Sequence, residues 1–232
     1  PKIWLGVSLK MYFGYQQTLD WCRKVAGLAQ LPAVKNGEVG LFVLPAYPAI
    51  PAVADIFAKT PVRFGGQDVC QAENGAWTGE VSASMLQELG CSLAEIGHAE
   101  RRRHFHEDKA QIAAKVAMSL RHGLTPVLCI GEEQQAEPEQ AIALCEQQLA
   151  EALADATQQG LSGDVFFAYE PQCAIVAPQP APDSYIRAVC SGLQQLTTPN
   201  GISFHIISGC SAAPAPIQLL ASAVTRLLLA SL

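Results

Sequence analysis

The sequence predicts an α/β protein in which short parallel strands alternate with longer helices within one domain, residues 1–232. Short apolar runs recur along the chain, and helical patterns fill the spaces between them. Strands that alternate with helices in this way are typically parallel and joined by helical crossovers. No linker or change of composition interrupts the alternation, so we expect a single domain. The alternation alone does not distinguish a closed eightfold barrel from a doubly wound open sheet.

Seven apolar runs are predicted to be strands. Each run is brief and rich in Val, Ile, Leu or Phe, as expected of strands that are buried on both faces. The predicted strands are Ile3–Ser8, Val39–Val43, Val62–Gly66, Leu93–Gly97, Thr125–Ile130, Val165–Tyr169 and Phe204–Ile207.

The clearest predicted helix runs from Lys109 to His122. Ile112 and Val116 lie four residues apart there, basic residues fill the last turn, and Gly123 provides the stop. The other predicted helices, which show the same apolar spacing, are Ser82–Gly90, Ala141–Ala154 and Ser184–Leu196.

The composition is that of a globular protein with a large core. Half of the 232 residues are hydrophobic, 16% are charged, and the net charge of −6 argues against nucleic acid as a main partner. No apolar run reaches the ~20 residues that a membrane-spanning helix needs, so no membrane partner is expected. The chain opens directly into an apolar strand without a secretory pattern, and a cytoplasmic location is therefore expected.

Neither a metal site nor a disulfide framework is indicated. The eight cysteines are scattered and form no C-x-x-C pair. Apolar neighbours, as around Cys129, favour structural thiols. His104 and His106 have no cysteine or carboxylate at ligand spacing with them, so we expect no metal.

Polar residues at predicted strand ends are the candidate catalytic groups, because ligands of parallel α/β proteins bind at the carboxyl ends of the strands. Lys10 closes the first strand and could hold a phosphate or a developing oxyanion, although a lone lysine more commonly marks a strand's exit into solvent. His98 ends the fourth strand at a helix start, whose partial positive charge disfavours imidazolium. The alternative interpretation of His98 is a solvated, charged helix turn.

Glu170 follows an apolar strand directly and precedes Pro171. Beside apolar neighbours the pKa of its carboxyl is expected to rise toward the range useful to a base; the alternative is a helix-initiating Glu-Pro pair. The long, proline-rich segment from Gln172 to Asp183 suits an active-site lid or a simple connector. Together, Glu170 would remove a proton from the carbon beside a carbonyl, while His98 and Lys10 would stabilise the enediolate oxygen.

The chain resembles the triosephosphate isomerase family in five segments, in the same order and over nearly its whole length. The segments are Ser8–Met11, Gly75–Glu80, Gly97–Arg102, Cys129–Glu132, and Ala168–Pro171 with Ala174 and Ile175. The third and fifth are highly specific when found together. The resemblance implies a (βα)8 TIM barrel of parallel strands with outer helices, no cofactor and a homodimer. It also implies an aldose–ketose isomerase of a small phosphorylated sugar that works through an enediolate.

The resemblance also implies a role for each site residue. Lys10 would be the substrate-binding electrophile, His98 the electrophile, Glu100 a supporting acid and Glu170 the base. A glutamate base with a neutral histidine is the established pairing in triosephosphate isomerase itself. The residues implied in contact with the substrate or its phosphate are Ser8, Gly209, Ser211 and the backbone near Val176, and Thr78 lies in the loop that reaches the neighbouring subunit's site.

Several positions depart from the family pattern. Ser8 replaces an asparagine, Leu9 a tryptophan and Ala99 a serine, and the two lid glycines are Val176 and Pro178. Proline fixes φ and removes an N–H, so lid hinging and phosphate capture are expected to differ. The residues that correspond to the base, the histidine and the lysine are retained, while residues expected to surround the substrate differ. Erythrulose phosphate isomerases, the four-carbon members of the family, are therefore the leading candidate, and the three-carbon triose phosphate is the second.

The last βα unit of the barrel is expected to be incomplete in this sequence. After Ser211 the chain continues for 21 residues, 212–232, whereas a helix, a strand and a final helix need roughly thirty. Either residues are absent from the sequence or the barrel is open. An open barrel would expose two strand edges, which favours absent residues.

Two other functions are compatible with parts of the sequence. The altered lid and the absence of a glycine pair after the eighth strand are also features of a non-catalytic phospho-ligand-binding barrel. An aldolase would need a Schiff-base lysine inside a strand, and Lys10 is the only strand-end lysine available for it. The His98 and Glu170 pair argues against the aldolase.

Overall fold

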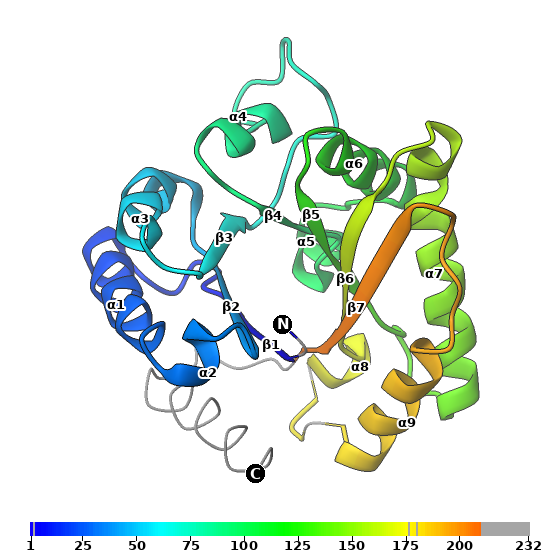
Figure 1. Ribbon diagram of the computed structural model, residues 1–232. Coiled ribbons are helices and arrows are strands. Elements are labelled where there is room, and N and C mark those ends of the chain that lie inside the picture. Colours follow the sequence, from blue (N-terminus) through cyan, green and yellow to red (C-terminus); the bar gives the residue numbers. More distant parts are fainter. Residues whose placement is uncertain (2, 176, 180, 210–232) are drawn as a thin grey trace. The chain divides into compact units, whose positions relative to one another are not determined.

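Figure 1 shows the computed structural model of the chain, which describes residues 1, 3–175, 177–179 and 181–209. These residues form two compact units. The first comprises Pro1–Gln67 and Met85–Leu93, and the second comprises Asp68–Ser84 and residues 94–209. Each unit has its own strands, helices and buried core, and the single domain expected from the sequence stays a prediction.

The first unit is built on three parallel strands in sequential order. They are β1 (Ile3–Ser8), β2 (Val39–Leu44) and β3 (Arg63–Gly66). Every residue of β2 is buried, as its apolar sequence predicts for a central strand. The helical segments α1 (Tyr15–Leu28), α2 (Pro32–Lys35), the 3-10 turn η1 (Tyr47–Ala49) and α3 (Ile50–Phe57) lie on one side of these strands (Figure 1). Ser8 pairs with Leu44, so the residues that follow β1 and β2 leave the sheet at the same edge.

The second unit contains the strands β4 (Leu93–Ile96), β5 (Thr125–Ile130), β6 (Gly163–Tyr169) and β7 (Ile202–Ser208), in that order. β5, β6 and β7 are parallel, and their register sets Ile130 beside Tyr169 and Tyr169 beside Ser208. Its helices are α5 (Ala99–His104), α6 (Lys109–Arg121), α7 (Pro138–Gln158), α8 (Gln172–Ile175) and α9 (Asp183–Leu193). In sequence, α4 (Ala83–Glu88) and β4 each cross the boundary between the two units.

Local sequence signals explain where the long helices of the second unit begin and end. Asp108 caps α6 by accepting from the backbone N–H of Gln111, and the Gln111 side chain accepts from the Asp108 N–H in return. Gly123, at φ 71°, follows the end of α6 in the left-handed conformation that glycine adopts without strain. Pro138 occupies the first turn of α7, where its missing N–H costs no helical hydrogen bond.

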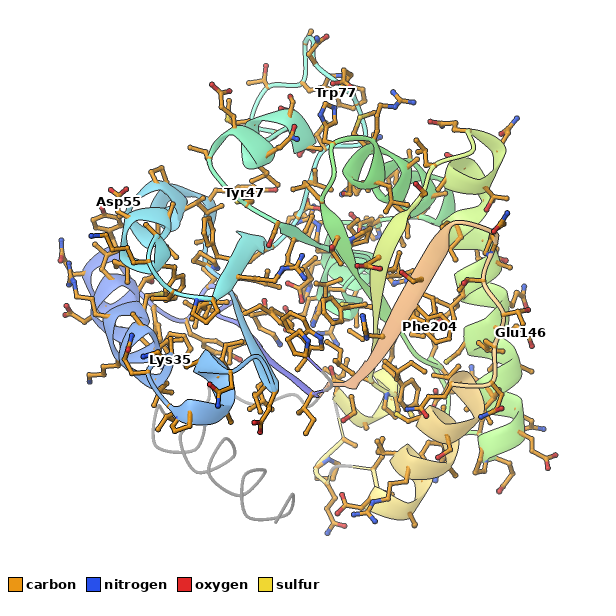
Figure 2. The ribbon with its side chains drawn as sticks, in the orientation of Figure 1. Lys35, Tyr47, Asp55, Trp77, Glu146 and Phe204 are labelled. Carbon is orange, nitrogen blue, oxygen red and sulfur yellow. The ribbon has the colours of Figure 1, made fainter. Side chains whose placement is uncertain are left out.

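Aromatic residues of β6 and β7 form much of the core of the second unit. Phe166 and Phe167 are buried. The Phe204 ring projects from β7 on the side of α7 (Figure 2) and stacks on the Phe167 ring with the centroids 4.8 Å apart. Offset stacking of this kind adds about 0.5–1.5 kcal/mol to the burial of the two rings.

The predicted strands are all present, with ends displaced by up to two residues. The predicted helices correspond to α4, α6, α7 and α9. α7 extends from Pro138 to Gln158, beyond the predicted Ala141–Ala154, and α9 ends at Leu193 before the predicted Leu196. The chain also forms helices that were not predicted, which are α1, α2, α3 and α8. α8 lies in the segment from Gln172 to Asp183 that was expected to be a lid or a connector.

All cysteines in the described part of the chain are free thiols. Burial raises the pKa of Cys22, Cys91 and Cys145 to about 12, so these side chains remain protonated and act as small hydrophobes. Among the described residues, no helix is both long and apolar enough to cross a bilayer.

Candidate active site

Three candidate residues of the second unit lie at strand ends. His98 follows β4 after Gly97, Glu170 follows β6 directly, and Gly209 follows β7 directly. β4 is the neighbour of β5, and β5, β6 and β7 run parallel. Glu170 and Gly209 therefore meet at the carboxyl edge of adjacent strands, which is where parallel α/β proteins bind their ligands.

His98 caps the N-terminus of α5 with its ring. Its Nδ1 atom accepts a hydrogen bond from the backbone N–H of Glu100, with 3.1 Å between the nitrogens. Nδ1 must therefore carry a lone pair, and the proton of the neutral ring is on Nε2. The Glu100 carboxylate lies 3.6 Å from Nδ1, but an unprotonated Nδ1 forms no ion pair with it. His98 is thus arranged as a neutral donor through its Nε2–H group.

Glu170 is held between two glycines. Its backbone N–H donates to the Ile130 carbonyl at 3.0 Å. A Cβ atom added at Gly209 would lie 3.3 Å from the Glu170 carboxylate, and one added at Gly131 would lie 1.9 Å from the Glu170 carbonyl oxygen. The Glu170 side chain therefore packs against the backbone of Gly209, and only glycine leaves room at position 131. Of the predicted site residues, the structure brings Glu170 into contact with Gly209 and His98 into contact with Glu100.

Arg102 connects the residue that follows β4 with β5. Its Nε atom donates to the Gly97 carbonyl at 2.7 Å and its Nη2 atom donates to the Cys129 carbonyl at 3.1 Å. Sequence reasoning did not assign a role to Arg102. Its position in the charged segment after His98 indicates a polar role but does not identify its partners. The carbonyls that it binds are 5 and 27 residues away in sequence.

Cys129 is a thiol that is influenced by the charge of Glu170. Its Sγ atom lies 3.9 Å from a carboxylate oxygen of Glu95. Burial raises the pKa of Cys129 most strongly, the negative charges of Glu95 and Glu170 raise it further, and Arg102 opposes them. The thiol therefore remains protonated and is not a nucleophile.

The amide side chain of Gln148, on α7, binds both backbone groups of Gly131. It accepts from the Gly131 N–H and donates to the Gly131 carbonyl, each at 2.9 Å. The Gly131 carbonyl also accepts from the Gln172 side chain at 3.1 Å. These bonds fix the turn that follows β5 against the turn that follows β6, where Glu170 lies.

Lys10 lies in the first unit, two residues beyond β1. It adopts φ 51°, a left-handed conformation that is uncommon for a residue with a side chain. The Gln67 side chain donates to the Lys10 carbonyl at 2.9 Å and to the Leu44 carbonyl at 3.0 Å. Backbone strain of this kind persists where the surroundings hold it in place, which is frequent at functional sites. The convergence of Lys10 with His98 and Glu170 stays a prediction.

The remaining predicted site residues lie in different parts of the chain. Ser8 is the half-buried last residue of β1. Thr78 is exposed in the loop of the second unit that begins at Asp68, and Trp77 lies near its tip (Figure 2). Val176 and Ser211 lie outside the described residues, as does the end of the chain where the last βα unit was expected to be incomplete.

Buried charges hold the start of this loop. The Asp68 carboxylate binds the Lys115 ammonium at 2.8 Å and the Arg101 guanidinium at 3.1 Å, and Glu107 binds both cations as well. Asp68, Glu107 and Lys115 are all buried, and a buried ion cluster of this kind is costly to break. The loop that carries Thr78 is therefore anchored at its base. Within the described part of the chain, no group of three or more His, Cys, Asp or Glu side chains is arranged to hold a metal ion.

Parallel strands that alternate with helices, with polar residues at the strand ends, are typical of α/β barrel proteins. The family model of triosephosphate isomerase matches residues 3–224. The chain belongs to the triosephosphate isomerase family, and its fold is the (βα)8 TIM barrel of that family, as the resemblance implied.

Three similar relatives carry the same name. L-erythrulose-1-phosphate isomerase of Pectobacterium atrosepticum is 52% identical over 231 residues, which are 98% of this chain and 89% of the relative. The protein of the same name from Brucella abortus is 37% identical over 176 residues, 75% of this chain and 67% of the relative. That from Rhizobium rhizogenes is 35% identical over 191 residues, 81% of this chain and 72% of the relative.

Proposed function

We propose that this chain is an isomerase of a small phosphorylated sugar. L-erythrulose 1-phosphate is the first candidate substrate and a triose phosphate is the second. The family and the names of the relatives support the substrate class. The observation that carries the chemistry is that the Nδ1 atom of His98 accepts from the Glu100 N–H while the Glu170 side chain packs against Gly209, each residue lying at a strand end of the second unit.

The proposed reaction moves one proton between neighbouring carbons. Glu170 removes a proton from the carbon beside the substrate carbonyl, and the electrons of that C–H bond form the double bond of an enediolate. The Nε2–H of His98 and the ammonium of Lys10 donate to the carbonyl oxygen as negative charge develops on it. Glu100 supports His98 through the backbone hydrogen bond to Nδ1. Glu170 then returns a proton to the former carbonyl carbon, while the proton of the neighbouring hydroxyl group passes to the former carbonyl oxygen through His98, so that the carbonyl re-forms on the neighbouring carbon. No electrons leave the substrate, so the reaction requires no redox cofactor.

The substrate decides which kind of sugar is formed. In a triose phosphate, the enediolate connects carbons 1 and 2, and the reaction interconverts a ketose and an aldose, as predicted from the sequence. In L-erythrulose 1-phosphate the carbonyl is at carbon 2, and the neighbouring carbon that carries a free hydroxyl group is carbon 3. The same proton transfer then shifts the carbonyl to carbon 3. The product is again a ketose, and because its carbons are numbered from the opposite end, the phosphate is then on carbon 4.

Incubation in heavy water is the direct test of this function. With L-erythrulose 1-phosphate we expect the protein to introduce deuterium at carbon 3, and with dihydroxyacetone phosphate at the carbon that bears the free hydroxyl group, because the base exchanges its proton with solvent. NMR of the recovered sugars identifies the labelled carbon. Absence of label across a panel of three- to five-carbon phosphosugars, with binding retained, would favour the non-catalytic phospho-ligand binder.

We also propose that the chain works as a homodimer through the loop that carries Thr78. Large apolar side chains are exposed on loops of both units, among them Met11, which is 96% exposed, Phe105, 64%, and Trp77, 45%. Exposed apolar groups on loops with anchored bases are typical of an interface.

Light scattering of the purified protein is expected to give the mass of two chains. Trp77→Glu is expected to shift the mass toward one chain, because a carboxylate would be desolvated in the interface. Lys35→Glu, an exposed change on α2 (Figure 2), is the matched control and should leave the mass unchanged. A wild-type mass of one chain at all concentrations would rule out the dimer.

A further inference from the structure

Glu132 is a buried carboxylate that binds two tyrosines from different parts of the second unit. Glu132 directly follows Gly131 and is 1% exposed. The hydroxyl of Tyr169 donates to both carboxylate oxygens, at 3.0 and 3.2 Å, and the hydroxyl of Tyr185 donates to one of them at 2.7 Å. The two carboxylate oxygens thus accept all three hydrogen bonds.

Both tyrosines are fixed as donors. Burial, followed by the charge and hydrogen bonding of Glu132, raises the pKa of Tyr169 and of Tyr185. The two phenols therefore keep their protons, and a hydrogen bond from a hydroxyl to a carboxylate is one of the stronger kinds in proteins.

Tyr169 brings this cluster next to the proposed base, since it directly precedes Glu170. The backbone N–H of Gln172 donates to the Glu132 carbonyl at 2.9 Å, and that of Glu170 donates to the Ile130 carbonyl at 3.0 Å. The near end of the segment from Gln172 to Asp183 is therefore tied to the turn at Glu132 through the backbone.

Tyr185 ties the far end of the same segment to the same carboxylate. It lies in the first turn of α9, where its backbone N–H bonds to the Pro182 carbonyl. α9 is itself held against α7, because a Cβ atom at Gly192 would lie 2.3 Å from the Ile142 side chain, and Val189 is fully buried. The Tyr185 hydroxyl is thus presented from a fixed helix.

We propose that Tyr185 is a positioning residue whose hydroxyl, through the Glu132 carboxylate, ties the start of α9 to Tyr169 and so holds Glu170 and the segment from Gln172 to Asp183 in register. The effect on Glu170 rests on the proposed function, whereas the anchoring of the segment does not. Tyr185 touches no reacting atom in this arrangement. Its contribution reaches the reaction through Glu132 and Tyr169.

Tyr185→Phe tests the proposal because it removes only the hydroxyl. We expect kcat to fall about tenfold while KM changes less than about threefold, since the variant misplaces the base without removing a substrate contact. Glu132→Gln should lower kcat as well, and the double variant should be no slower than Glu132→Gln alone, because both changes break the same connection. Additive losses in this cycle would overturn the proposal.

Val189→Ala is the matched control for general loosening of α9. It removes buried methyl groups from the same helix and is expected to lower the melting temperature at least as much as Tyr185→Phe, with kcat unchanged. If Val189→Ala and Tyr185→Phe reduce kcat equally, Tyr185 acts only through stability and the proposal fails.

Hydrogen–deuterium exchange separates this proposal from the proposed function. In Tyr185→Phe we expect amides of peptides that cover residues 172–183 to exchange about tenfold faster, with β5 peptides unchanged. If exchange is faster in the variant but the wild-type protein isomerises no phosphosugar, the anchoring role of Tyr185 is supported and the proposed isomerase function is rejected. If the wild-type protein is an active isomerase and Tyr185→Phe changes neither exchange nor kcat, the anchoring role of Tyr185 is rejected and the proposed function is retained.

Discussion

Glu170→Gln is expected to lower kcat about a thousandfold on whichever phosphosugar the wild-type protein isomerises. Glutamine keeps the size and most of the packing of the side chain against Gly209, but it cannot accept a proton from carbon. The substrate-binding groups are unchanged, so KM should stay within about threefold of the wild type. Steady-state kinetics and the rate of deuterium incorporation should fall together, because both depend on the same proton transfer.

Two variants define what the Glu170→Gln result means. Glu170→Asp keeps the carboxylate but withdraws it by one methylene group, and a loss of about a hundredfold is expected from misplacement alone. Glu133→Gln changes an exposed glutamate on the neighbouring turn and should be fully active. Full activity of Glu170→Gln would show that another group is the base and would falsify the assignment.

Gly131→Ala is expected to lower the free energy of unfolding by more than about 4 kcal/mol. The new Cβ atom would lie 1.9 Å from the carbonyl oxygen and 2.7 Å from the carbonyl carbon of Glu170, which are backbone atoms. Neither side has room to yield, because Gln148 holds the Gly131 backbone and the Ile130 carbonyl holds the Glu170 N–H. Any molecules that fold must displace Glu170, so kcat/KM should fall at least about a hundredfold.

Gly27→Ala is the control for this change. Gly27 lies in α1, and a Cβ atom there meets nothing within 4 Å. Alanine should stabilise the helix by about 0.5–1 kcal/mol, because it restricts the unfolded chain more than glycine does. Urea unfolding followed by circular dichroism measures both variants. A Gly131→Ala protein with wild-type stability would contradict the close approach of the two turns.

The strands were the most predictable part of the fold. Ile3–Ser8 and Thr125–Ile130 match β1 and β5, because each is an apolar run that is bounded by polar or turn residues. β6 and β7 begin two residues before their predicted starts, at Gly163 and Ile202, where the ladder between the strands continues through residues that the apolar pattern does not include. The end of a strand depends on its neighbour as well as on its own composition.

The longer unpredicted helices, α1 and α3, begin without a side-chain cap. α1 begins after Gly14 without a side-chain cap and has no acidic residue in its first turn. α3 follows a 3-10 turn that begins at Tyr47, and the apolar segment after it is compatible with more than one structure. Both helices depend on burial against their own unit, which the sequence does not reveal locally.

The residues of the candidate site could be predicted from the sequence, but the hydrogen bonds that orient them could not. His98 and Glu170 are found from the sequence because each is a polar group that follows an apolar strand. The proton position on His98 requires the observed bond to the Glu100 N–H. Tyr185 lies 53 residues from Glu132, and only the folded chain reveals that the two side chains meet.

The Gln148 carboxamide gives α7 an additional constraint. Its paired bonds with Gly131 reproduce the donor and acceptor that an adjoining β-strand would present. Because a helix rotates by about 100° for each residue, inserting or deleting a single residue between Pro138 and Gln148 would swing that carboxamide away from the turn. The spacing between the start of α7 and this glutamine is therefore a fixed length, so evolution can vary the exposed side chains along it far more freely than the number of residues.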